Sequence, residues 1–150
     1  MTSAVEVYNK PSFAYREETF AILSINAWEL LLKAKVLKDA ANDLKALRVY
    51  EPRKTKSGKP SRKLYLKRNR AGNALTISLP ACVAALERST NKVPAEVKVN
   101  LIALMAIRDN SVHYVTASTV LSRQAQELAS ASVKNFVLLA RKWFAKDLSQ

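Results

Sequence analysis

Apolar residues recur at intervals of three and four along residues 16–37, the spacing that predicts an amphipathic helix. Glu17 and Glu18 fall in the expected first turn, where the helix dipole favours carboxylates. Ile25 and Leu32 lie on the side opposite the main apolar stripe, which consists of Phe20, Leu23, Ala27, Leu30, Leu31, Ala34 and Leu37. A helix that is apolar on two faces needs a second packing surface, which a partner subunit can supply.

The second half of the chain predicts three further helices. Residues 79–88 begin after Ser78, a suitable cap, with Pro80 in the first turn. Residues 95–107 are apolar over most of the helix girth, and residues 119–146 carry a seam close to a heptad repeat. The pattern therefore predicts an all-α fold, a helical bundle.

One of these helices has a polar end. Asp109 and Asn110 favour turns because their side chains compete for backbone hydrogen bonds. We therefore expect the helix that ends at Arg108 to distort or break before His113.

Residues 47–79 interrupt the helical pattern. They contain both glycines of the chain, Gly58 and Gly72, together with turn residues between short apolar runs. This composition predicts an irregular insert or a β-hairpin. Basic residues dominate it at about residues 48–72, with Glu51 as the single acid among ten cations: Arg48, Arg53, Lys54, Lys56, Lys59, Arg62, Lys63, Lys67, Arg68 and Arg70.

The length and charge of the chain limit its class. With 150 residues, of which 49% are hydrophobic, we expect a single domain over residues 1–150. The formal net charge of +13 favours a polyanionic partner, with nucleic acid as the first candidate. No apolar stretch is long enough to span a membrane and no signal-peptide pattern opens the chain, so we expect no membrane association and a cytoplasmic location.

The few cysteine and histidine residues limit metal chemistry. Cys82 is the one cysteine and His113 the one histidine, so no cluster of this kind exists to hold a metal, and we expect neither a metal nor another cofactor. Cys82 itself is expected to be a small buried apolar residue.

Arg108 and His113 are the candidate catalytic pair. A histidine exchanges protons near neutral pH, and an arginine can bind a phosphate and balance its charge. Together these two groups have the chemistry to cleave RNA. The alternative is a partly exposed histidine near a helix terminus, stabilised by the helix dipole.

Three blocks of sequence are notable: EETFAIL at residues 17–23 and NAWELLLKAK at 26–35, both within the first long helix, and RDNSVHY at 108–114, which contains the pair. Together they resemble a bacterial uncharacterised-domain family within the HEPN superfamily (higher eukaryotes and prokaryotes nucleotide-binding). The superfamily signature is an arginine, four to six residues that begin with a polar one, and a histidine at the end of a bundle helix. Here the interval is four residues and opens with Asp109 and Asn110.

The resemblance implies a metal-independent endoribonuclease that dimerises so that the Arg and His of both subunits meet in one cleft. His113 would move protons to or from the ribose 2′-hydroxyl and the leaving 5′-oxygen, and Arg108 would stabilise the phosphate in the transition state. The product would carry a 2′,3′-cyclic phosphate. Such domains occur in toxin–antitoxin, abortive-infection and antiphage systems, which implies an antitoxin or another regulatory partner.

Further residues complete the expected site. Asn110 would orient the phosphate or His113, or else cap the helix break. Asp109 is expected to be a local partner of Arg108 or a helix cap, rather than a proton donor. Tyr114 is expected either to stack on an RNA base or to pack against other side chains of the protein. A polar strip of Asn26, Glu29 and Lys33 lines the cleft, or else Glu29 and Lys33 form a solvated i,i+4 ion pair.

The basic insert is expected to guide RNA through sequence-independent phosphate contacts, with Tyr50 and Tyr65 available for base stacking. The residues expected to bind RNA are Arg53, Lys54, Lys56, Lys59, Arg62, Lys63, Lys67, Arg68 and Arg70. The alternative for the insert is a solvated loop. Two other functions remain open for the whole chain: a non-catalytic RNA-binding or sensing module of the same fold, and a structural interaction protein.

Overall fold

The computed structural model describes residues 1–13, 15–55, 57–89, 92–113 and 119–145. For residues 110–113 and 119–125 it describes the backbone and not the side chains.

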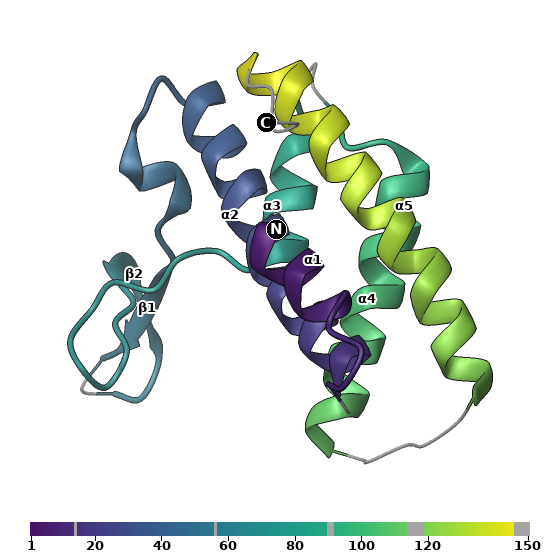
Figure 1. The fold of residues 1–150 in the computed structure, drawn as a ribbon. Coiled ribbons are helices and arrows are strands. Elements are labelled where there is room, and N and C mark those ends of the chain that lie inside the picture. Colours follow the sequence, from purple (N-terminus) through teal and green to yellow (C-terminus); the bar gives the residue numbers. More distant parts are fainter. Residues whose placement is uncertain (14, 56, 90–91, 114–118, 146–150) are drawn as a thin grey trace.

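The described residues form helices that surround one long central helix, with a small sheet to one side (Figure 1). The helices are α1 (Thr2–Tyr8), α2 (Arg16–Asp39), α3 (Leu79–Leu86), α4 (Ala95–His113) and α5 (Thr119–Phe144). A 3-10 helix, η1 (Leu44–Leu47), follows α2 and leads into strands β1 (Tyr50–Lys54) and β2 (Pro60–Leu66), which pair antiparallel.

The predicted all-α class is wrong. Over the part of the chain that the structure describes, the fold is mixed α/β and dominated by helices, being 62% helical with one two-stranded antiparallel sheet. Of the two alternatives for the insert, the structure has the hairpin. Gly58 turns the chain with φ 77°, a left-handed conformation that favours glycine, and the flanking segments pair as strands.

Helix α2 buries the side opposite the main apolar stripe most completely, whereas the stripe is buried only in part, with Phe20 3% exposed and Leu23 and Leu31 half-buried against the core. Ile25, Trp28 and Leu32 are at most 1% exposed, whereas Leu30 of the stripe is 69% exposed. The stripe includes the small residues Ala27 and Ala34, while the opposite side carries the large indole of Trp28, which offers more apolar area to bury. As a result, α2 leaves Leu30 and Ala34 of the stripe exposed to the solvent.

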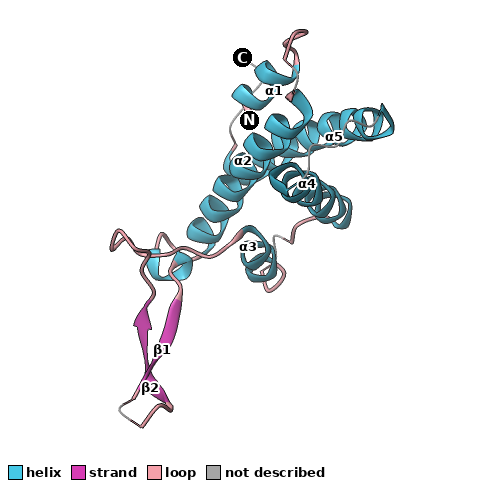
Figure 2. Cartoon of the chain, turned by 90° about the horizontal axis from the view of Figure 1, so that it is seen from below, coloured by secondary structure: helices cyan, strands magenta, loops and turns pink. Residues whose placement is uncertain are grey.

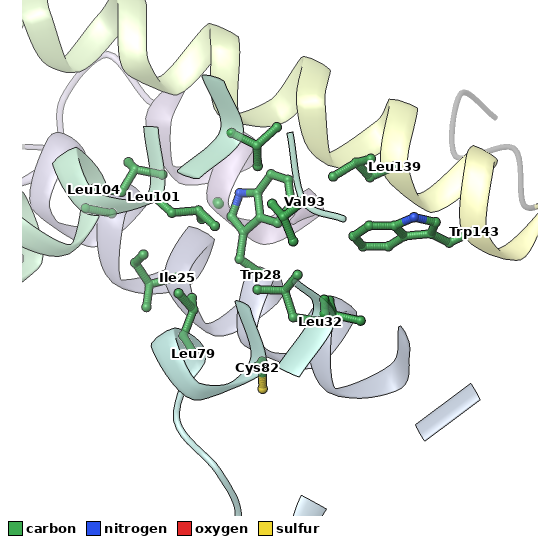
Figure 3. Packing of buried hydrophobic residues seen from close by; sticks show 14 of the residues in the cluster. Ile25, Trp28, Leu32, Leu79, Cys82, Val93, Leu101, Leu104, Leu139 and Trp143 are labelled. Atoms are coloured by element: carbon green, nitrogen blue, oxygen red, sulfur yellow. The ribbon is translucent and has the colours of Figure 1, made fainter. Parts of the chain in front are cut away.

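Trp28 connects α2 to α5 at the centre of the core (Figure 3). Its indole Nε1 donates a hydrogen bond of 2.8 Å to the Ser132 hydroxyl, and both residues are buried. The ring also contacts Phe136 edge-on, with ring centroids 5.3 Å apart. Ser132 of α5 therefore satisfies the one polar atom of the buried indole.

Helix α1 lies outside the elements that the sequence pattern predicts. It packs on α2, where Ala4 is fully buried and the Tyr8 ring meets Phe20 edge-on at 5.3 Å.

The hairpin of β1 and β2 projects from the helical body (Figures 1 and 2). Its strands pair in the register Tyr50↔Leu66, Glu51↔Tyr65 and Pro52↔Leu64, and the register shifts between Pro52 and Lys54. A third extended segment strengthens the base of the hairpin, because Val49 donates a backbone hydrogen bond to the Leu75 carbonyl.

Candidate functional site

Helix α4 runs without a break to His113, so the expected distortion after Arg108 is wrong. The reason lies in the side chain of Asp109. Its Oδ1 accepts hydrogen bonds from Arg108 Nε at 3.0 Å and Nη2 at 2.8 Å. A carboxylate that is bound in this way does not compete for backbone N–H groups, so the helix continues.

The continuous helix fixes how the candidate residues are placed around its axis. Each residue turns the helix by about 100°, so Arg108 and His113, five apart, lie about 140° apart around it. Asp109 lies only about 40° from His113 on the same face and is bonded to Arg108. Asp109 therefore stands between the two candidate catalytic positions, and Arg108 and His113 of one chain do not share a face.

Arg108 and Asp109 are accessible at this end of the molecule. Their side chains are 33% and 59% exposed. The backbone of Asn110 and His113 is helical, while their side chains lie outside the described set. Tyr114 lies outside the described residues altogether, as does Lys56 in the insert.

The Glu29–Lys33 part of the predicted strip does not reach Arg108 within one chain. Lys33 Nζ donates to Glu29 Oε1 at 2.5 Å and to Thr76 Oγ1 at 2.7 Å, so it connects α2 to the base of the hairpin. Helices α2 and α4 run in opposite directions, so the start of α2 lies beside the end of α4 (Figure 1). Lys33 lies 17 residues along α2 from Arg16, about 25 Å from that end. Asn26 is exposed on the outer side of α2.

An exposed row of mostly apolar residues runs along helix α4. Ala95, Val99, Ile102, Ala106 and Asp109 are all exposed and follow one another at alternating steps of four and three. Val99 and Ile102 are 64% and 69% exposed. The next position in this spacing is His113. Apolar positions at this spacing form the seam along which two helices pack.

The cations of the insert project into the solvent. The described residues expected to bind RNA are all exposed: Arg53, Lys54, Lys59, Arg62, Lys63, Lys67, Arg68 and Arg70. Lys67 pairs with Glu51 at 2.9 Å, and Arg68 donates to the Gly72 carbonyl at 2.6 Å. The insert therefore presents a positive surface.

Tyr65 is not a free stacking platform. The Arg53 guanidinium lies 4.3 Å from the centre of its ring, and Lys63 Nζ lies over the same ring at 5.6 Å. The ring holds these two cations in place.

Two further polar groups are notable here: Glu18, which the sequence predicts only as a first-turn residue of its helix, and Thr76, which the sequence pattern does not single out. Oε2 of Glu18 is buried and has no hydrogen-bond partner. Glu18 lies in the first turn of α2, at the end of the molecule where α4 finishes (Figure 1). Thr76 Oγ1 accepts the hydrogen bond that Lys33 Nζ donates. No sequence pattern marks the burial of Glu18 Oε2 or the contact between Lys33 and Thr76, because both depend on packing between distant segments.

The described residues contain no group of three or more His, Cys, Asp or Glu side chains that could hold a metal ion. Cys82 is fully buried, and this burial raises the pKa of its thiol to about 11. Its thiol therefore stays protonated and unreactive near neutral pH. Within the described parts of the chain, no helix is long and apolar enough to cross a membrane.

Comparison with known proteins gives one match. No curated protein and no solved structure matches the chain. One family matches it over residues 1–150, described as a domain of unknown function, DUF3644. The chain, with its exposed α4 row and basic hairpin, therefore belongs to the DUF3644 family.

Proposed function

We propose that this chain is a HEPN-type endoribonuclease that cleaves RNA without a metal ion and leaves a 2′,3′-cyclic phosphate. The observation that carries the proposal is the exposed row on α4, which leads through Ile102 and Asp109 to the position of His113. A net charge of +13 and the exposed cations of the hairpin supply affinity for RNA. DNA is spared because it lacks the 2′-hydroxyl nucleophile.

The chemistry needs one proton-transfer group and one cation at the phosphate. His113 accepts the proton of the attacking 2′-hydroxyl or donates one to the leaving 5′-oxygen. Arg108 stabilises the charge that builds on the phosphate, and Asn110 orients the phosphate or the imidazole. Asp109 uses two of the five N–H donors of Arg108, so three remain for phosphate oxygens.

A second copy of the chain completes the site. The positions of Arg108 and His113 lie about 140° apart around the axis of α4, so one helix does not present both positions to one phosphate. A two-fold interface along the Val99–Ile102–Ala106 row buries these apolar residues and brings Arg108 of one copy towards His113 of the other. We therefore propose a homodimer with a composite cleft.

One observation favours a second candidate, a non-catalytic RNA-binding or sensing module. In the isolated chain the charge of Arg108 is partly neutralised by Asp109 at 2.8 Å. If this pair is only structural, the hairpin is the functional surface and His113 has no catalytic role.

The setting follows from the proposed activity. An endoribonuclease without sequence-specific contacts harms its own cell, so we place it in a toxin–antitoxin or antiphage system in the cytoplasm. An antitoxin or another regulatory partner would then hold it inactive.

The test is RNA cleavage by purified protein in EDTA, with total RNA and single-stranded DNA as substrates. The proposal expects cleavage of RNA alone, loss of cleavage in His113→Ala and Arg108→Ala, and retained cleavage in Arg88→Ala. Arg88 is an exposed arginine just after the end of α3 and serves as the matched control. RNA that is bound with equal affinity by all four proteins and cut by none supports the non-catalytic module.

A further inference from the structure

The β1–β2 hairpin has two chemically different faces. Side chains alternate between the faces of a strand, and directly paired residues share a face. The pairs Tyr50↔Leu66 and Pro52↔Leu64 therefore belong to one face and Glu51↔Tyr65 to the other. The Arg53 guanidinium above the Tyr65 ring marks the second face as cationic.

The first face exposes an apolar patch. We define the hairpin patch as Tyr50, Pro52 and Leu64. All three are exposed, with Tyr50 at 40% and Leu64 at 58%. A hairpin that projects from the body gains little stability from an uncovered apolar surface. The patch is therefore a candidate surface for an occupant.

The positive charges around the patch indicate which kind of partner can bind it. Lys54 and Arg62 stand two residues further towards the tip on the two strands, and both are exposed. A second copy of this hairpin would bring like charges together, which disfavours it as the occupant. A polyanion with flat apolar groups fits both the patch and its cations.

We propose that the hairpin selects single-stranded RNA, with an unpaired base stacked on Tyr50 against Leu64 and neighbouring phosphates on Lys54 and Arg62. This inference names the substrate class of the proposed ribonuclease and rests on that function. In duplex RNA the bases are already stacked and paired, so the patch has nothing to receive. An aromatic ring beside cations is the arrangement by which proteins bind unpaired bases of varied sequence.

The two tyrosines of the hairpin thus have different roles. The Tyr65 ring is covered by Arg53 at 4.3 Å and orders the cationic face. Tyr50 is the ring left for a base, because no aromatic or cation contact covers it among the described residues and 40% of its surface is exposed.

The test measures binding of the full chain carrying His113→Ala, so that the RNA is not consumed. Fluorescence anisotropy compares a 12-nucleotide single strand with a 12-base-pair duplex at several salt concentrations. Tyr50→Leu keeps an apolar side chain and removes the ring. Tyr15→Leu, at an exposed tyrosine before α2, is the matched control.

We expect Tyr50→Leu to weaken single-strand binding by about 5- to 150-fold, the range for one base stacked on an aromatic ring. Duplex binding and the salt dependence stay unchanged, and Tyr50→Trp restores single-strand affinity. Lys54→Gln and Arg62→Gln each lower the slope of log affinity against log salt by about 0.7.

Equal affinity for single strand and duplex, or equal effects of Tyr50→Leu and Tyr15→Leu, would overturn the proposal. Tyr50→Leu and Tyr50→Trp are both compared by circular dichroism, so a loss of affinity through a misfolded hairpin is recognised when Tyr50→Trp also fails. Because no cleavage is measured, failure here leaves the ribonuclease proposal standing. Failure of cleavage likewise leaves this binding result intact.

Discussion

Ser132→Ala tests whether the buried bond between α2 and α5 stabilises the core. The substitution removes the acceptor of the Trp28 Nε1 hydrogen bond, which is 2.8 Å long, in a place where Trp28 is 1% and Ser132 0% exposed. An indole N–H left buried without a partner costs about 1–3 kcal/mol. For a chain of this size, each kcal/mol lowers the melting temperature by about 2–4 °C.

The control is Ser130→Ala, an exposed serine two residues earlier on the same helix. Both substitutions gain the same helix propensity, so their difference isolates the buried bond. Urea and thermal unfolding followed by circular dichroism should place Ser132→Ala about 1–3 kcal/mol below Ser130→Ala. Two variants of equal stability would refute the reasoning.

Three further predictions concern other parts of the molecule. Glu18→Gln removes a carboxylate that has one buried, unpartnered oxygen, so this variant should unfold at a higher urea concentration than Glu17→Gln, which loses the 3.2 Å pair with Arg16. Both variants lose the same favourable interaction with the helix dipole, and the reverse order of the two urea midpoints would contradict the prediction. Burial raises the pKa of Cys82 to about 11, so a thiol reagent at pH 8 should label this thiol only in urea, and rapid labelling of the folded chain would argue against burial. Because the pKa of Cys82 is higher in the folded than in the unfolded chain, the stabilising contribution of the protonated thiol is complete below pH 9 and is lost as the pH rises towards 11. Ile102→Asp places a charge in the apolar row of α4, so it should convert the proposed dimer to a monomer in analytical ultracentrifugation and abolish the proposed cleavage, whereas Leu44→Asp on η1 should do neither. A dimer that tolerates Ile102→Asp would place the interface elsewhere.

The positions of the long helices could be predicted from sequence, and the core side of α2 could not. The expected helix begins at Arg16, as the structure has it, because Glu17 and Glu18 suit its first turn. Its two apolar sides are equivalent in a binary pattern. Trp28 has two tertiary partners, Ser132 and Phe136, and only these contacts decide which side is buried.

The end of α4 was mispredicted for a local reason. Asp109 in isolation favours a turn, but next to Arg108 its carboxylate is bound by the guanidinium and the helix continues. Helix α1 escaped prediction because its seven residues include β-branched threonine and valine, which are weak helix formers. Packing against α2 through Ala4 and Tyr8 holds it.

Part of the candidate site could likewise be foreseen. The Arg108–Asp109 partnership follows from their adjacency, and the structure contains it. The attachment of Lys33 to Thr76 could not be foreseen, because 43 residues separate the two in sequence. The same holds for the cation pair over Tyr65, which depends on the register of the hairpin.

The most direct test of the proposed chemistry is the cleavage of one short single-stranded RNA in EDTA, beside the same sequence with every 2′-hydroxyl methylated. Mass spectrometry identifies the 3′ end of the upstream fragment. The proposed ribonuclease mechanism predicts a 2′,3′-cyclic phosphate from the unmodified strand, no cut in the methylated strand, and no cut by His113→Ala. Cleavage of the methylated strand, or cutting by His113→Ala at the wild-type rate, would contradict it.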